Sequence, residues 1–125
     1  VITPSFVGHF AHALSAGGRI RLPGAGRPVR DALHVDDLAK VCEAFADSAI
    51  RHGLYNVGGG RENASTIRGL VEKMEEVSGL LAVIDEQNPL QDPVPFNYVS
   101  SLDRVSHELG WKPMVDLSTG LKSLF

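Results

Sequence analysis

The chain has 125 residues, of which 43% are hydrophobic and 22% charged, a composition that excludes a disordered segment and predicts one modest globular domain. Its net charge of −3 gives no support for nucleic acid as a partner. Residues 1–35 nevertheless carry four arginines against one aspartate, a net +3, which leaves −6 for the remainder. A cationic segment on a mildly acidic domain favours a small anionic ligand over a duplex.

The single cysteine, Cys42, cannot form an internal disulfide, which favours a reducing, cytoplasmic setting. We interpret it as a packed thiol and not as a nucleophile, because it lies on the apolar face of a predicted helix. No apolar run approaches membrane-spanning length, so no membrane partner is expected. The chain begins with Val1 and ends on the apolar Phe125, and we interpret it as part of a larger protein, whichever way it was shortened.

From the N-terminus, apolar residues at helical spacing predict a helix over residues 4–14, with Thr3 as its N-cap. A glycine pair at 17–18 ends this helix. Polar and apolar residues then alternate over 19–22, which predicts a short half-buried strand. A loop rich in glycine and proline follows at 23–28.

Residues 29–35 are predicted to be extended, and Asp36 is predicted to cap the amphipathic helix that follows. The apolar stripe of that helix consists of Leu38, Val41, Cys42, Phe45 and Ala49. Gly53 ends the helix, and the residues at 54–57 predict a buried strand.

After a triple glycine at 58–60, a third helix is predicted, with Asn63 or Ser65 as its N-cap and Gly79 at its end. Apolar residues recur along one face of this helix, so it is predicted to be amphipathic like the preceding one. Residues 80–84 are a further strand candidate.

Three prolines predict a loop over 87–95, and residues 96–99 are a candidate edge strand. Ser101 is expected to cap a helix that runs through Leu109, and Asp116 or Ser118 begins the last helix. These elements predict an α/β fold, a small mixed domain of about five helices and short strands.

Three motifs carry a resemblance to a known family. They are Arg30–Asp37 (RDALHVDD), Tyr55–Gly60 (YNVGGG) and Glu108–Pro113 (ELGWKP). In this order and spacing they make the chain resemble the carboxyl-terminal part of an extended short-chain dehydrogenase/reductase, a family that includes the NAD-dependent nucleotide-sugar epimerases and dehydratases. The resemblance spans essentially the whole chain. It implies that residues 1–125 are the C-terminal, substrate-binding lobe of an extended Rossmann-type enzyme, with the NAD-binding Rossmann part absent.

Arg30 is the strongest candidate for a binding residue, because a guanidinium is a planar fork that can bond phosphate oxygens through two donors. The alternative, from the residues alone, is a surface ion pair with Asp31 or Asp36. The resemblance implies that Arg30 contacts the pyrophosphate of a bound nucleotide-sugar.

The resemblance also implies four further substrate-binding residues. It places Thr3 near the nucleotide phosphates, and Ile20 and Leu22 on a strand that lies against the base. The alternative for these residues is ordinary core packing, which the residues alone favour. Many relatives carry an Arg-x-Gly-Asp segment whose arginine is a second phosphate clamp, and here the neutral Gln91 is the nearest stand-in. Either the phosphate is held differently or the substrate is not a typical nucleotide-sugar.

The catalytic and cofactor motifs of the family are absent from the chain. Neither Tyr55 nor Tyr98 is followed four residues later by the lysine that the family's Tyr-x-x-x-Lys requires. The glycines at 24–26 and at 58–60 do not match a dinucleotide fingerprint that opens a helix. We therefore expect no catalytic residue and no cofactor in this chain, and NAD(P) in the full-length protein.

Pairs of acidic residues and of histidines have structural interpretations. Asp36 and Asp37 are interpreted as a helix cap and a first-turn residue and not as an acid–base pair. His34 is interpreted as a structural histidine. His9 and His12 lie three residues apart on the first helix, but no third ligand is evident, so no metal site is expected.

The preferred hypothesis is therefore a lobe that grips the nucleotide and pyrophosphate of a nucleotide-sugar, with the missing N-terminal Rossmann domain as its partner. That remote binding energy would position the sugar against the nicotinamide, so the parent is expected to be an enzyme, an isomerase or dehydratase, although this lobe alone should catalyse nothing. The parent is also expected to be a cytoplasmic homodimer. The alternative is a degenerate, non-catalytic relative that acts as a binding or regulatory module.

Overall fold

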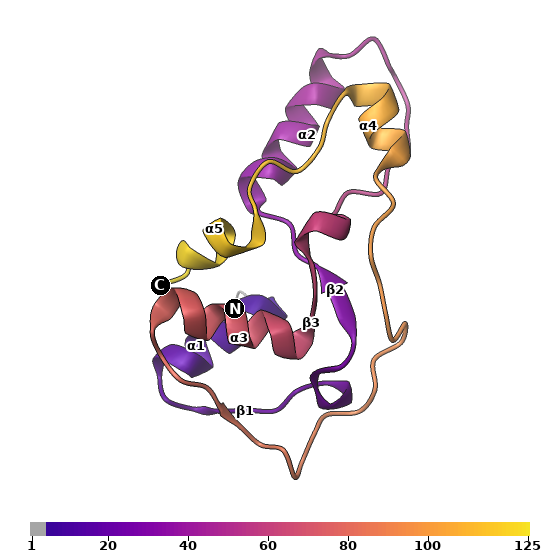
Figure 1. Ribbon diagram of the computed structural model, residues 1–125. Coiled ribbons are helices and arrows are strands. Elements are labelled where there is room, and N and C mark those ends of the chain that lie inside the picture. Colours follow the sequence, from indigo (N-terminus) through magenta and orange to yellow (C-terminus); the bar gives the residue numbers. More distant parts are fainter. Residues whose placement is uncertain (1–4) are drawn as a thin grey trace.

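The computed structural model describes residues 5–125 and contains, in these residues, five α-helices and four short strands (Figure 1). The helices are α1 (Phe6–Ser15), α2 (Val35–Asp47), α3 (Ile67–Ser78), α4 (Asp103–Leu109) and α5 (Leu117–Lys122). The strands are β1 (Arg19–Ile20), β2 (Val29–Asp31), β3 (Ala64–Thr66) and β4 (Val83–Ile84). The predicted α/β class and the number of helices are confirmed. None of the helices described is long and apolar enough to cross a membrane.

The strands form two small ladders that join distant parts of the chain. β1 pairs in parallel with β4, so that Arg19 faces Val83 and Ile20 faces Ile84. β2 pairs in antiparallel fashion with β3. The first ladder lies beside α1 and α3, and the second leads upward to α2 and α4 in Figure 1.

The apolar core has two parts, one at each end of the molecule. The larger cluster joins α1, β1, α3 and α5, and its buried members are Phe10, Leu14, Ile20, Leu22, Ile67, Leu70, Val71, Met74 and Leu121. The smaller cluster joins α2, α4 and the segment after α4, and its buried members are Val41, Val105 and Trp111. Figure 1 shows α2 and α4 together at one end, apart from α1, α3 and α5.

Two predicted helix caps near the N-terminus were wrong. Ser5 caps α1, where its hydroxyl accepts a hydrogen bond from the Gly8 N–H at 3.2 Å, while Thr3 lies outside the described residues. His34 caps α2, where its Nδ1 atom accepts from the Asp36 N–H at 3.2 Å, so Asp36 lies within the first turn instead. A histidine ring can satisfy the same free N–H that a short polar side chain usually takes. The structural interpretation of His34 is confirmed.

The later caps were predicted with mixed success. Thr66, and not Asn63 or Ser65, caps α3, because its hydroxyl accepts from the N–H three residues later at 3.0 Å. Gly79 ends α3 with a left-handed φ of 71°, as predicted. Ser101 lies outside α4, whose first turn follows Leu102 without a side-chain cap. Asp116 caps α5, which confirms one of the two predicted positions.

Two predicted strands are absent from the described residues. Residues 54–57 and 96–99 belong to no ladder, and Leu54 is 84% exposed. Their local pattern favours strand, but a strand needs a neighbour to satisfy its backbone, and residues 54–57 pair with no other part of the described chain.

The stripe predicted for α2 is only partly buried. Val41 is buried and Phe45 half-buried, with its ring 6.3 Å from that of Tyr55. Leu38 and Cys42 are exposed, so the prediction of a packed thiol at Cys42 was wrong. The reason is that α4 and Trp111 cover one side of α2, and no other described element covers the side that carries Cys42.

Candidate functional site

A segment that we call the strap, residues 88–98, lies along the cationic part of the chain between β1 and β2. Backbone bonds hold one end, where the Leu90 N–H donates to the Leu22 carbonyl at 3.1 Å. At the other end the Tyr98 N–H donates to the Val29 carbonyl at 3.0 Å. The strap, which carries Gln91, is therefore joined to the segment from Leu22 to Val29 at two points.

Arg30 fastens the strap through its side chain. Its Nη1 donates to the carbonyl oxygens of Val29 at 2.7 Å and Phe96 at 2.8 Å, and its Nη2 donates to that of Pro95 at 2.9 Å. The residue is half-buried, and its guanidinium has no carboxylate within 4.0 Å in residues 5–125. The alternative interpretation of an ion pair with Asp31 was wrong.

The two aspartates proposed as ion-pair partners have other contacts. Asp31 Oδ2 accepts from the N–H groups of Gly60 at 2.9 Å and Ser100 at 3.1 Å. Asp36 is exposed and lies 3.6 Å from the ring nitrogen of His34. Neither carboxylate therefore balances the charge of Arg30.

A second arginine, Arg27, packs against the same strap. The Arg27 Nε donates to the Gly24 carbonyl at 3.2 Å, and its Cζ lies 5.9 Å from the centre of the Phe96 ring. Gly24, Ala25 and Gly26 all have left-handed φ angles, which turn the chain so that this carbonyl faces the Arg27 side chain. Sequence analysis did not select Arg27, although the excess of arginines in residues 1–35 was a signal for it.

The remaining predicted site residues have different environments. Ile20 and Leu22 are each 1% exposed and belong to the larger core cluster, which agrees with the core-packing alternative. Gln91 is exposed on the strap, directly after the residue that forms a bridge with Pro23. Thr3 lies outside the described residues, so its predicted place near phosphates stays a prediction.

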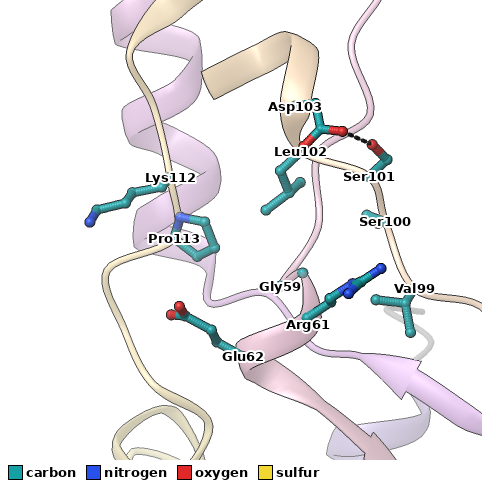
Figure 2. A pocket seen from close by; sticks show the side chains of 11 residues that line it. Gly59, Arg61, Glu62, Val99, Ser100, Ser101, Leu102, Asp103, Lys112 and Pro113 are labelled. Carbon is teal, nitrogen blue, oxygen red and sulfur yellow. Dashed lines mark hydrogen bonds between the residues drawn. The ribbon is translucent and has the colours of Figure 1, made fainter. Parts of the chain in front are cut away.

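A separate cavity of about 460 Å³ lies beside the triple glycine (Figure 2). Figure 2 shows Arg61 and Glu62 on one side of it and Lys112 on another, with Ser101 bonded to Asp103 on the third. Its charged side chains are of both signs, and none of the predicted binding residues lines it. The Ser101 hydroxyl and the Asp103 carboxylate are its one bonded hydroxyl–carboxylate pair, but no histidine lines the cavity, so the nucleophile–histidine–acid arrangement is not present there.

Ionisable groups with shifted pKa values belong to exposed structural pairs. The Tyr55 hydroxyl donates to Glu108 at 2.6 Å and Arg104 donates to the same carboxylate at 2.9 Å, which together hold the pKa of Glu108 below its usual value. The same bond to Glu108 raises the pKa of Tyr55. These groups tie α4 to the segment before the triple glycine, so we interpret them as structural and not as an acid–base pair. Across residues 5–125, no group of three or more His, Cys, Asp or Glu side chains is placed to hold a metal ion.

The profile of the NAD dependent epimerase/dehydratase family matches residues 2–58. GDP-L-fucose synthase 1 of Arabidopsis thaliana is 34% identical over 127 residues, which cover 99% of this chain and 38% of that protein. A dTDP-glucose 4,6-dehydratase of Streptomyces griseus is 32% identical over 90% of this chain and 34% of its own length. The chain thus spans little more than a third of the length of these two curated relatives.

The fold is likewise similar to that of solved members of the family. The crystal structure of UDP-glucose 4-epimerase from Thermotoga maritima with UDP-glucose superimposes with a TM-score of 0.80 at 25% identity. The match covers 94% of this chain and 37% of that one. The similarity therefore extends over nearly all of the present chain and over one part of a larger protein.

Proposed function

Because this chain belongs to the NAD-dependent epimerase/dehydratase family, we propose that it is the nucleotide-sugar-binding lobe of an enzyme of that family. Its role is to hold the nucleotide and the pyrophosphate, while the chemistry takes place against the rest of the protein. Binding energy far from the reacting carbon positions the sugar and thereby contributes to catalysis.

The observation that carries this proposal is the state of Arg30. Three backbone carbonyls orient its guanidinium, but carbonyl oxygens do not neutralise its full positive charge. A half-buried cation that is oriented and not balanced favours a negatively charged ligand, and a pyrophosphate supplies the oxygens that a guanidinium fork bonds well.

The residues present do not fit NAD. The turn at 24–26 leads into β2, and the triple glycine leads through a short turn at 61–63 into β3, so neither opens an α-helix whose N-terminus could hold a pyrophosphate. We place the NAD(P) site in the part of the relatives that this chain does not match. The dimeric and cytoplasmic state of the whole protein stays a prediction.

The partner of this lobe is, in our proposal, the Rossmann-type part of the same protein. Leu38 and Cys42 leave one side of α2 exposed, and residues 54–57 have a strand pattern without a strand neighbour. Since the relatives are more than twice as long as this chain, the added part supplies a sheet edge for residues 54–57 and a cover for α2. We expect the amides of residues 54–57 to exchange slowly with deuterium in the full-length protein. Exchange there as fast as in an exposed loop would contradict this pairing.

The nucleotide site is tested by calorimetric titration of the full-length protein with UDP, CDP, GDP and dTDP. We expect one of the four to bind best, and Arg30→Ala to weaken that binding about tenfold to a hundredfold, because a charged hydrogen-bonding group contributes roughly 1.5–3 kcal/mol. Arg104→Ala is the matched control, since that arginine is exposed and paired with Glu108 away from the strap. Failure of all four nucleotides to bind would instead favour a non-catalytic relative.

A further inference from the structure

Arg27 and Arg30 contact the same residue of the strap from two directions. The Arg27 guanidinium lies over the ring of Phe96, and Arg30 donates to the carbonyl oxygen of Phe96. Phe96 is 36% exposed, so this junction lies at the surface and is open to a ligand. Two guanidinium groups are therefore held around one exposed residue.

Like charges held together in this way need a negative partner. In residues 5–125, neither arginine lies within 4.0 Å of a carboxylate oxygen. By contrast, Arg68 and Arg104 are each bonded to a glutamate at 2.9 Å. The carboxylate of Asp92 lies beside Gly24 but makes no ion pair with Arg27. The charge on the strap is thus left for something outside the chain.

Both guanidinium groups also keep free donors. A guanidinium has five N–H donors. Arg27 uses one of them, toward Gly24, and Arg30 uses three, toward the carbonyls of residues 29, 95 and 96. The bonds that are made fix the direction of each group, and the donors that remain are available to phosphate oxygens.

We propose that Arg27 is a second phosphate-binding residue, which together with Arg30 holds the two phosphates of a nucleoside diphosphate group. This inference rests on the proposed function and assigns the substrate site a residue that the sequence motifs did not indicate. Gln91, also on the strap, is neutral and exposed and has no part in this pair of charges. One guanidinium for each phosphate gives the site a preference for diphosphates over monophosphates.

The test measures the affinity of the full-length protein for the preferred nucleoside diphosphate and for the matching monophosphate. We expect Arg27→Gln, which removes the charge and keeps much of the length, to weaken diphosphate binding about tenfold. Monophosphate binding should change much less, so the ratio of the two affinities falls. Arg61→Ala is the control, because that arginine is exposed and lies outside the strap, and it should leave the ratio as it is. Thermal unfolding of each variant verifies that the fold is retained.

The outcomes separate the two proposals. If the unmodified protein binds no nucleoside diphosphate, the proposed function fails. If it binds one, and Arg27→Gln leaves the ratio of diphosphate to monophosphate affinity unchanged, only the role of Arg27 is overturned. The salt dependence of binding gives a second readout, because loss of one ionic contact should make the diphosphate affinity less sensitive to ionic strength.

Discussion

Replacement of Gly59 by alanine is expected to lower the free energy of unfolding by about 3 kcal/mol or more, because the added Cβ would overlap a backbone carbonyl. A Cβ on Gly59 would overlap the carbonyl oxygen of Ala32 and lie 2.8 Å from the Cβ of Asn63. Neither neighbour is the flexible end of a side chain. The chain at Ala32 would have to move, and it leads directly from β2 to α2. Urea unfolding followed by circular dichroism measures the loss.

Gly79→Ala is the matched control for this substitution. Gly79 has a left-handed φ of 71°, but nothing lies within 4 Å of the position of its Cβ. We expect alanine there to destabilise by about 1 kcal/mol, through backbone conformation alone. Gly59 does not have a positive φ, so its effect comes from the close approach alone. Equal losses in the two variants would show that the contact between Gly59 and Ala32 is not tight.

The triple glycine shows what sequence reasoning missed at the centre of the fold. From the sequence, Gly58–Gly60 only separates a predicted strand from a predicted helix. The structure adds that the glycines close around Asp31, whose carboxylate accepts from the Gly60 and Ser100 N–H groups. Asp31 is separated from Gly60 by 29 positions and from Ser100 by 69, so no local sequence pattern indicates these two contacts.

Helices were predictable because their signals are local. Apolar spacing and the glycine at position 79 located the five helices, although α2 ends at Asp47 and not at Gly53. The other errors fell on the caps, where several short polar side chains compete for the same N–H. Strands were less predictable, since residues 54–57 have a strand pattern but no described neighbour. The prediction that Cys42 is buried failed for the same reason. An apolar stripe indicates which face of a helix can be buried, but not whether another element covers it.

The candidate site was predictable in part. The chemistry of guanidinium and the family resemblance both selected Arg30, and the structure adds that three carbonyls hold it. The sequence did not indicate Arg27, because its role depends on the strap. The strap lies almost seventy residues further along the chain, and it places Phe96 under the Arg27 guanidinium. Spacing along the chain carries no information about such a meeting.

Asp37, the second residue of the Asp36–Asp37 pair, contributes to stability and not to catalysis. Its side chain is 0% exposed, and Oδ2 accepts from the N–H groups of Met114 at 2.9 Å and Val115 at 2.8 Å. The Trp111 Nε1 donates to the Asp37 carbonyl oxygen at 3.0 Å, so the segment after α4 is fastened to the first turn of α2 at several points. Its neighbour Asp36 is exposed.

We therefore expect Asp37→Ala to lower the free energy of unfolding by about 2–4 kcal/mol, because two partly buried N–H groups lose their acceptor. Asp37→Asn should cost less. Its amide oxygen can still accept both bonds, and its NH2 group takes the place of Oδ1, which already lacks a hydrogen bond and lies 3.7 Å from the Lys40 Nζ. Asp36→Ala is the control and should cost roughly 0.5 kcal/mol, through the helix dipole. Urea unfolding of the three variants gives the order. If Asp37→Ala proved no more damaging than Asp36→Ala, the segment from Trp111 to Val115 would have to be held in place by its apolar contacts alone.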